Sequence, residues 1–490
     1  MLTTTKRSST TSTNFAAKRR KLKDTSLDTI RKYINSEKGE AIQALYMVFE
    51  SGSFSFETHQ KNNLPCKFVT YLNLEGYTFI GYGNTKVSSR SSASRIALLH
   101  LLDDSTVPSS KLDDYRPQLN VPLVSETSHF PEDLPDVIAS LVLSKYDELR
   151  NAEKSNLPWF KVISGIVMIR NNDYKNGRVV VMSTGTKCIE PKNLQTNGCV
   201  LIDSHAEILC RRALRLFLYT QIESSRDGIA SILHHNGSKF EIEKDISLYL
   251  FISSAPCGDS RIFTVSGQDK SVDKHPNRVC RGVLRIKLDG GNSTVPVIKY
   301  ETDSRLMVMS CSDKLLKMNV LGLQGSLLSN FVEPIYLSGV IIGDSFPHSH
   351  ASRALYERIA SSDFPNPFRL NKVTIFGVHK AIKSISTCPK LNVNWICEST
   401  IEITNSTNGK VVDGTLSRLC KYRLFEQFLK IYRAAGEKND LGRAYDYFKS
   451  KAVHYQKTKE ILYQLLEAKK LGKWIQRNRI FNQFTFMSSD

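Results

Sequence analysis

The sequence predicts an α/β protein with a small N-terminal domain and a much larger domain behind it. Two observations carry this prediction. Residues 31–104 show a helical pattern, three strand-like runs and a second helical pattern, whereas strand-like and helical runs alternate from residue 134 to residue 490. Residues 105–133, between the two regions, are rich in Pro, Ser and Asp without any apolar period, which is typical of a linker.

The composition narrows the class of protein. The chain has 490 residues, and 67 Lys and Arg against 48 Asp and Glu give a net charge of +19. Apolar residues make up 41% of the chain, as expected of a folded protein, and its apolar runs are shorter than the ~18 residues of a membrane helix. We therefore expect no membrane association and no secretory signal. The positive charge indicates a polyanionic partner, with nucleic acid first.

Residues 1–30 are polar and basic, and we expect a disordered tail. The tail contains the cluster Ala17–Lys23, in which five of seven residues are Lys or Arg. A nuclear-import partner would recognise such a cluster, so we favour a nuclear location, with the cytoplasm as a second one. The alternative is a solvated basic tail that adds nonspecific affinity for RNA.

The small domain is predicted to have the order α-β-β-β-α. Its helical patterns cover Gly39–Glu50 and Ser91–Leu102, and its strand-like runs cover Phe54–Thr58, Lys67–Leu74 and Tyr77–Gly83. This order resembles a double-stranded RNA-binding domain. The resemblance implies recognition of an RNA duplex by its shape, through minor-groove hydroxyls and phosphates.

One departure concerns the phosphate contacts of this domain. The family usually places Lys-Lys-x-x-Lys at the start of the last helix, whereas this chain has Lys86-Val87-Ser88-Ser89-Arg90. Lys86 and Arg90 remain the candidate RNA contacts, and the loss of one phosphate contact lowers affinity and its salt dependence. Unaided duplex binding, docking of a protein, and delivery of RNA by a helper RNA-binding protein all stay open.

The large domain, residues 134–490, is predicted to be a layered α/β core. Strand-like and helical runs alternate along it. They are Val179–Ser183, Ile246–Ser253, Gly282–Lys287 and Tyr336–Gly343 for strands, and Pro135–Arg150, Glu207–Glu223, Ala351–Ile359, Arg418–Ala435 and His454–Ala468 for helices.

Two short patterns in this domain point to metal chemistry. His205-Ala206-Glu207 precedes a predicted helix, although Ser204-x-x-Glu207 also has the form of a capping box, which is the structural alternative. Pro256-Cys257 follows an apolar strand, where a thiol with a lowered pKa suits a metal ligand. His-x-Glu followed by Pro-Cys is the signature of zinc nucleobase deaminases. Because Ser260 stands where their second Cys is usual, a third zinc ligand must come from elsewhere.

Several strings, in this order and spacing, resemble the deaminase domain of the adenosine deaminases acting on RNA. They are Gly185–Cys188, His205–Glu207, Pro256–Phe263, His275–Arg278, Met309–Lys314 and Gln324–Leu328. The resemblance covers about residues 134–486 and implies a zinc-dependent domain with a cytidine-deaminase-like core. The zinc ligands would be His205, Cys257 and Cys311, and the proton shuttle would be Glu207.

The resemblance implies that the protein hydrolyses adenosine to inosine in double-stranded RNA, after flipping the base out of the duplex. Seven further residues would contact the RNA. They are Thr186, Lys187, Arg261, Arg278, Arg281, Asn292 and Arg305. Asn292 would fill the space left by the flipped base, where vertebrate enzymes carry Glu.

The resemblance also implies a buried inositol hexakisphosphate. The residues around it would be Arg211, Arg212, Lys287, Lys314, Lys317, Gln324, Ser326, Lys421, Tyr445, Lys449, Tyr455, Lys459 and Trp474. The alternative is that these helices carry outward Lys and Arg, as most helices do. If these cations are buried, they require an anionic partner, because an unpaired buried charge is very costly.

Other functions remain as competing hypotheses. A transfer-RNA adenosine deaminase would use the same zinc chemistry, and a catalytically silent RNA-binding regulator would keep the fold without the reaction. The intact set of His205, Glu207, Cys257 and Cys311 argues against the silent regulator. His348 and His350 also have the spacing of ligands, but we interpret them as surface residues of a loop. The sequence leaves the oligomeric state open.

Overall fold

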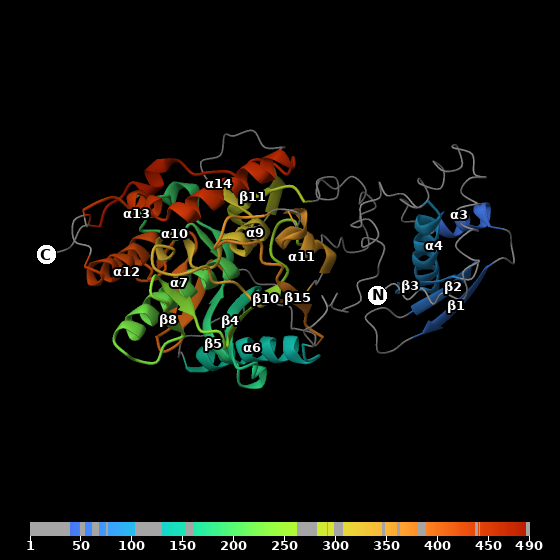
Figure 1. Cartoon of the computed structure of the whole chain (residues 1–490), viewed down its shortest axis with the longest axis horizontal. Helices are drawn as coiled ribbons and strands as arrows, with labels where there is room; N and C mark the ends of the chain where they lie inside the picture. Colours follow the sequence, from blue (N-terminus) through green and yellow to red (C-terminus); the bar gives the residue numbers. More distant parts are fainter. Residues whose placement is uncertain are drawn as a thin grey trace. The chain divides into compact units, whose positions relative to one another are not determined.

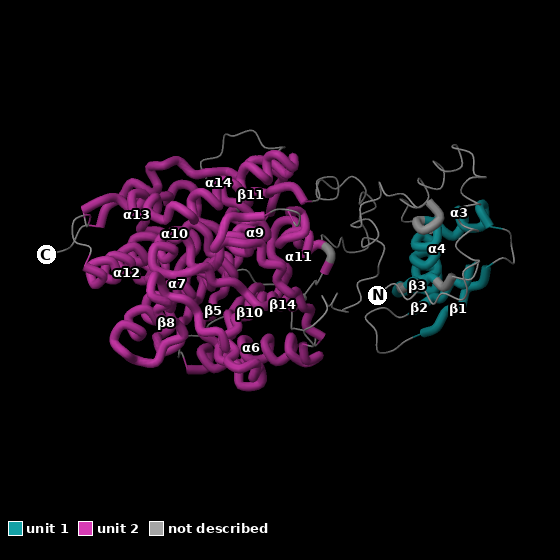
Figure 2. The backbone as a smooth tube through the Cα atoms, in the orientation of Figure 1, with its two compact units in different colours: residues 1–121 teal, residues 122–490 magenta. Residues whose placement is uncertain are grey.

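The computed structural model describes residues 40–49, 54–60, 68–74, 77–102, 130–152, 160–261, 282–291, 293–297, 307–344, 348–359, 363–379, 389–436, 440 and 442–486. The chain divides into two compact units, residues 1–121 and 122–490, which Figure 2 draws in different colours. The predicted basic tail and residues 105–129 of the predicted linker lie outside the described residues. Within the described part, no helix is long and apolar enough to span a membrane.

The N-terminal unit has the predicted α-β-β-β-α order. Its elements are α3 (Glu40–Val48), β1 (Phe54–Gln60), β2 (Phe68–Leu74), β3 (Tyr77–Gly83) and α4 (Lys86–Leu102). The three strands form one antiparallel sheet, and its core joins Leu45 of α3, Leu72 of β2 and Leu98 of α4. Helix α4 begins earlier than the apolar pattern predicts, because Thr85 and Ser88 cap it with reciprocal hydrogen bonds of 3.0 Å.

The large unit is built on one eight-stranded mixed sheet, in the order β15-β14-β10-β4-β5-β16-β17-β18. Strands β10, β14 and β15 run parallel, and the other neighbouring pairs are antiparallel. The strands are β4 (Ile163–Arg170), β5 (Arg178–Thr184), β10 (Ile246–Ser254), β14 (Gly339–Asp344), β15 (Thr374–Gly377), β16 (Leu391–Ile396), β17 (Glu402–Asn405) and β18 (Lys410–Val411).

The sheet is buried on both faces. Helix α6 (Leu134–Ala152) covers one face and helix α7 (Ala206–Arg226) covers the other (Figure 1). Successive residues of β10 therefore enter different cores: Leu250 packs in the core with α7, and Phe251 packs in the core with α6. Because both faces are apolar, β10 reads as a continuous hydrophobic run.

The remaining elements surround this sheet and hold the functional side chains. They are η1 (Tyr174–Asn176), β6 (Thr186–Cys188), η2 (Pro191–Asn193), β7 (Asp203–His205), β8 (Leu233–His235), β9 (Phe240–Ile242), β11 (Arg285–Leu288), η4 (Asp289–Gly291), β12 (Ser293–Pro296), β13 (Val308–Met309), α9 (Cys311–Leu321), α10 (Gly325–Leu328), α11 (His348–Leu355), η6 (Glu357–Ile359), α12 (Lys421–Ala434), α13 (Tyr445–Lys451), α14 (Val453–Ala468) and η7 (Arg479–Asn482).

Two expectations about these elements were wrong. The predicted helix Ala351–Ile359 is interrupted, so that α11 and η6 are separate, and α11 begins at His348. His348 and His350 therefore lie in a helix rather than in a loop. Helix α9 was not predicted, because it has only 11 residues and most of its side chains are buried, so it lacks a clear amphipathic period.

Candidate active site

His205 and Glu207 lie where strand β7 ends and helix α7 begins. Both side chains are buried, with exposed fractions of 6% and 3%. Strand β7 pairs with β6, which sets Thr186 opposite His205. The N-cap of α7 is His205, and no side chain caps this helix. The interpretation of Ser204 and Glu207 as a capping box is therefore wrong, and Glu207 is left for another role.

Cys257 and Cys311 come from distant parts of the chain. Cys257 lies just after the end of β10, and Cys311 is the first residue of α9. The backbone N–H of Cys311 donates to Sγ of Cys257 over 3.4 Å. Gly258 makes this approach possible, because its φ is 109° and a Cβ there would lie 2.3 Å from Oγ of Ser310. The two thiols thus meet at one end of the sheet.

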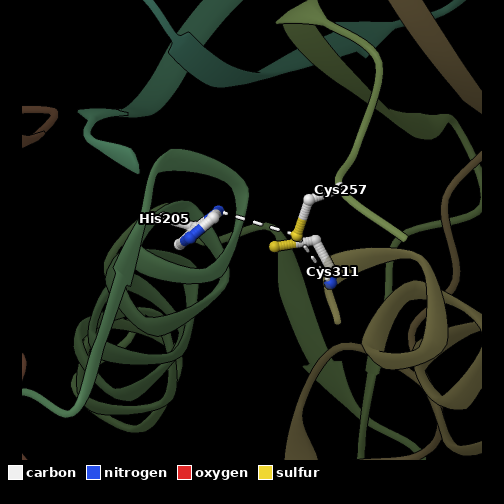
Figure 3. A group of neighbouring side chains, drawn as sticks. All are labelled: His205, Cys257 and Cys311. Atoms are coloured by element: carbon white, nitrogen blue, oxygen red, sulfur yellow. Dashed lines mark hydrogen bonds between the residues drawn. The ribbon is translucent and has the colours of Figure 1, made fainter. Parts of the chain in front are cut away.

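The donor atoms of His205, Cys257 and Cys311 lie within 4.8 Å of one another, and Figure 3 shows the three side chains converging. Nδ1 of His205 lies 3.9 Å from Sγ of Cys257. A tetrahedral zinc site with bonds of about 2.1–2.3 Å places neighbouring donors roughly 3.6–3.8 Å apart. The spacing and the chemistry of this set therefore fit zinc, and three protein ligands leave a fourth position open.

Charged neighbours favour the ligand form of Cys257. Its pKa is held well below the usual range by a hydrogen bond from Cys311 and by the positive charges of Lys287 and His205, although burial opposes this. Burial likewise opposes ionisation of Asp203, but the ammonium groups of Lys287 and Lys314 hold its pKa well below the usual range. The site is therefore prepared to hold a thiolate next to a carboxylate.

A second set of possible ligands shares His205 with the first. Cys188, Asp203 and His205 also bring their donor atoms within 4.8 Å of one another. The carboxylate of Asp203 already forms ion pairs with Lys287 and Lys314, so it is poorly suited to hold a metal. The set with two cysteines is the better zinc site.

Three of the predicted RNA contacts in the large unit lie on the segments next to the ligands His205 and Cys257. Thr186 and Lys187 are half-buried on β6. Arg261 is half-buried directly after the Cys257 turn, and its N–H donates to the carbonyl of Gly258 over 3.2 Å. The other predicted contacts lie outside the described residues. They are Arg278, Arg281, Asn292 and Arg305.

The two predicted RNA contacts of the N-terminal unit are exposed on α4, at Lys86 and Arg90. Arg90 is turned toward strand β1, since its Nε donates to Oγ1 of Thr58 over 3.2 Å and its guanidinium lies 5.6 Å from the ring centre of Phe56. Val87 stands between them with 62% of its surface exposed. Lys86 is therefore the more available of the two cations.

A group of cations gathers between α7, α9, α12 and the C-terminal segment. Lys317 contacts the hydroxyl of Tyr463 at 2.6 Å and lies 5.1 Å from the ring centre of Trp474. Lys421 and Lys449 lie 5.8 and 5.3 Å from the ring centre of Tyr445. Burial lowers the pKa of Lys317 most, and repulsion by four neighbouring cations lowers it further. These cations are Lys459, Lys449, Arg211 and Lys314.

Two cations of this group donate to backbone carbonyls, which are neutral acceptors. Arg211 donates to the carbonyl of Leu323 over 3.0 Å, and Lys421 donates to the carbonyl of Phe481 over 2.9 Å. Burial, followed by the charges of Lys449, Arg477, Arg212 and Arg215, lowers the pKa of Lys421 to about 6. Cations that are removed from water without an acidic partner are costly, so this group favours the binding of an anion of high charge.

The other predicted members of this cluster are placed in several ways. Lys287 and Lys314 pair with Asp203 on the zinc side, Arg212 donates to the carbonyl of Leu419, and Tyr455 is buried in α14. Lys459 donates to Gln456, and Ser326 is buried in α10. The amide nitrogen of Gln324 donates to Leu321 and Ser329, and the amide oxygen accepts the N–H of Ile335 over 3.1 Å.

Sequence reasoning missed Arg215 and Arg477, which the structure places in the same cluster. Nε of Arg215 is buried without a hydrogen-bond partner in the described part of the chain. A signal was present for Arg215, because it follows Arg211 by four residues and so shares its face of α7. Arg477 lies beyond the last long helix, where no period could indicate its neighbours.

The mixed sheet, the His-Cys-Cys set and the adjacent Glu207 define the class of zinc-dependent nucleobase deaminases. Residues 181–478 match the adenosine-deaminase (editase) domain family. The chain belongs to this family, that of the adenosine deaminases acting on RNA.

Curated relatives agree with this assignment. The double-stranded RNA-specific editase Adar of Drosophila melanogaster is 32% identical over 461 residues, which cover 89% of this chain and 67% of that protein. The double-stranded RNA-specific editase B2 of Rattus norvegicus is 32% identical, covering 87% of this chain and 59% of its own. A tRNA-specific adenosine deaminase 1 of Drosophila melanogaster is 30% identical, but covers only 46% of this chain.

Proposed function

We propose that this protein deaminates adenosine to inosine in double-stranded RNA by hydrolysis. The observation that carries the proposal is the buried carboxyl of Glu207, two residues from His205 and beside a donor set that fits zinc. Two relatives that match nearly the whole chain, the Drosophila melanogaster Adar and the Rattus norvegicus B2 proteins, are double-stranded RNA-specific editases. The overall reaction is adenosine and water giving inosine and ammonia.

The residues of this chain divide the chemistry between them. His205, Cys257 and Cys311 would hold zinc, which supplies an acidified water molecule when it is bound. Glu207 would accept a proton from the attacking water, pass it to the ring nitrogen during attack at C6, and later protonate the departing amine. Burial of Glu207 keeps bulk water away from this transfer.

The adenosine must leave the duplex before it can reach the zinc site, at a cost of a few kcal/mol. Thr186 and Lys187 on β6 are proposed to contact the sugar and phosphate, and Arg261 the flipped base. Arg278, Arg281 and Arg305 are proposed to contact the RNA backbone, and Asn292 to occupy the vacated position. Asn is shorter than Glu and needs no protonation to donate a hydrogen bond, so flipping by Asn292 should persist with an altered reach and an altered dependence on pH.

The cation cluster is proposed to hold inositol hexakisphosphate as a structural ligand. Support comes from the half-buried, mutually repelling side chains of Arg212, Lys317 and Lys421, whose pKa values are lowered by desolvation. A ligand with many phosphates would pair with all of them at once, and it would act in folding rather than in the chemical step.

The N-terminal unit is proposed to be a double-stranded RNA-binding domain that delivers the duplex. Its element order and the exposed position of Lys86 support this role. A helper RNA-binding protein is an alternative route of delivery. We also propose nuclear import through the cluster Ala17–Lys23, and unchanged nuclear accumulation after replacing Lys18–Lys21 with Ala would refute it.

The deciding experiment measures inosine in a long perfect RNA duplex treated with purified protein, beside Glu207→Ala, with zinc assayed in both. Inosine from the wild type alone, with zinc in both proteins, would support the proposal. Zinc without inosine would shift the assignment to transfer RNA or to a missing delivery partner. Well-folded wild-type protein without zinc would refute the deaminase assignment.

A further inference from the structure

The turn that carries Cys257 rests on the N-terminal end of α9, which carries Cys311. Ser312 donates both its N–H and its hydroxyl to the carbonyl of Cys257, over 3.0 and 2.9 Å. The hydroxyl groups of Ser260 and Ser312 lie 2.7 Å apart. The distance between the two thiols therefore depends on how these two segments are held together.

Two buried carboxylates extend the contact between these segments. Asp259, in the Cys257 turn, accepts the N–H of Gly282 over 2.8 Å. Asp313, in the first turn of α9, accepts the hydroxyl of Ser310 over 2.6 Å and the N–H of Arg285 over 2.9 Å. Their exposed fractions are 5% and 0%, and buried charges need ionic partners.

Arg353 and Arg358 supply these partners from a third segment. Arg353, on α11, donates to Oδ2 of Asp259 over 2.9 Å and to its carbonyl over 3.3 Å. Arg358, on η6, donates to Oδ1 of Asp313 over 2.7 Å and to the carbonyl of Gly282 over 2.8 Å. Gly282 thus joins the two ion pairs, since its N–H binds one carboxylate and its carbonyl binds the other guanidinium.

These contacts form one brace around the two cysteine segments. Helices α9 and α11 lie side by side, so the guanidinium groups reach the carboxylates without crossing solvent (Figure 1). The side chains of Arg353 and Arg358 are 17% and 3% exposed. Arg358 makes two bonds in different directions, and Arg353 makes its two bonds to Asp259 and a third contact, at 3.1 Å, with Nδ1 of His350. A lysine ammonium on a single flexible stem does not reproduce these arrangements.

We propose that Arg353 and Arg358 are positioning residues, which fix the two cysteine ligands at the separation that zinc requires. Arg353 should also affect the position of Arg261, the proposed contact to the flipped base. Arg261 follows Asp259 by two residues and lies in the same turn. The inference rests on the proposed function for its effect on catalysis, but its effect on zinc does not require any activity.

The test compares Arg353→Lys, Arg353→Ala and Arg358→Lys with Arg369→Lys as the matched control. Arg369 is exposed and lies against Tyr336, with 4.9 Å from its guanidinium to the ring centre. Zinc release to a chelator should be at least about tenfold faster in the first three variants, as for other outer-shell partners of metal ligands. The visible spectrum of the cobalt-substituted protein should change in these variants and not in the control.

The kinetic constants kcat and KM should respond differently to the substitution of Arg353 and of Arg358. In Arg358→Lys, kcat should fall with little change in KM for the RNA duplex, whereas Arg353→Lys should change both. A folded Arg353→Lys or Arg358→Lys with wild-type zinc release and a wild-type cobalt spectrum would overturn the inference, even if its melting temperature were lower. If the wild type proved inactive on duplex RNA, the proposed function would fail while the zinc and cobalt measurements still decided the role of the brace.

Discussion

The ammonium group of Lys287 lies 2.9 and 2.8 Å from the two carboxylate oxygens of Asp203, and both side chains are buried. The same ammonium lies 3.0 Å from Sγ of Cys311. Asp203 precedes His205 by two residues, so one ion pair connects the segments of two zinc ligands. The ion pair neutralises the charges of Lys287 and Asp203 inside the protein. It also holds the segment of His205 against the segment of Cys311.

We predict that Asp203→Asn destabilises the protein by about 3–5 kcal/mol, because it leaves the ammonium of Lys287 buried without a carboxylate. Chemical denaturation measures the change in the free energy of unfolding. As a control, Asp245→Asn breaks an ion pair with Arg170 that is partly exposed, so its effect should stay within about 1 kcal/mol. Equal effects of the two substitutions would contradict the prediction.

Glu207→Gln should lower the rate of inosine formation by about 10²–10⁴-fold, because the amide keeps the shape of the side chain but cannot accept the proton. Zinc content should stay unchanged, since Glu207 is not among the ligands. Single-turnover assays on duplex RNA, together with metal analysis, measure both quantities. A variant with near-wild-type rates would exclude Glu207 as the proton shuttle.

Cys311→Ser should abolish stoichiometric zinc binding, because a serine hydroxyl is a much poorer zinc ligand than a thiolate. The matched control is Cys397→Ser, a half-buried thiol outside both ligand sets. Metal analysis of the purified proteins makes the comparison. Full zinc content in Cys311→Ser would remove Cys311 from the proposed site.

The free energy of unfolding of the polyanion-free protein should fall as pH falls from about 10.5 to about 6. Burial and neighbouring cations lower the pKa of Lys421 from 10.5 to about 6 in the folded protein, so the unfolded chain binds more protons within this window. A bound inositol hexakisphosphate would pair with the ammonium and reverse this shift.

Melting temperatures at pH 7 and pH 9, with and without inositol hexakisphosphate, test the expectation. Without the ligand the protein should melt at a lower temperature at pH 7, and the ligand should reduce the difference. Lys421→Met should reduce it too, whereas Lys430→Met, at an exposed position of the same helix, should not. If the ligand left both melting temperatures unchanged, the cluster would not be its site.

Val87→Lys should strengthen duplex binding by the whole protein and steepen its dependence on salt, by about one in the slope of log K against log salt concentration. Val87 is 62% exposed between Lys86 and Arg90, so a new ammonium there needs no repacking. Val412→Lys adds the same charge at an exposed site of the other unit and serves as the control. Equal slopes for both variants would show that α4 does not face the RNA.

Hydrophobic periodicity predicted the order of elements in the N-terminal unit and, in the large unit, strands β5, β10, β11 and β14 and helices α6, α7, α12 and α14. It did not predict the central strand β4 or strands β15 to β18 of the same sheet. The continuous apolar run of β10 was readable because the strand is buried on both faces. Helix α9 was not predicted, because nearly all of its side chains are buried and its apolar residues therefore show no period of 3.6. The break between α11 and η6 also left no local signal.

The sequence by itself determined the residue types that can hold zinc, the buried strand behind Cys257 and the presence of many cations without matching acids. Only the tertiary structure decided which groups meet. It excluded the capping role of Glu207, gave Lys287 and Lys314 to Asp203, and added Arg215 and Arg477 to the cation cluster. Such pairings join segments far apart in the chain, so no local pattern encodes them, and the packing of helices on the sheet sets them.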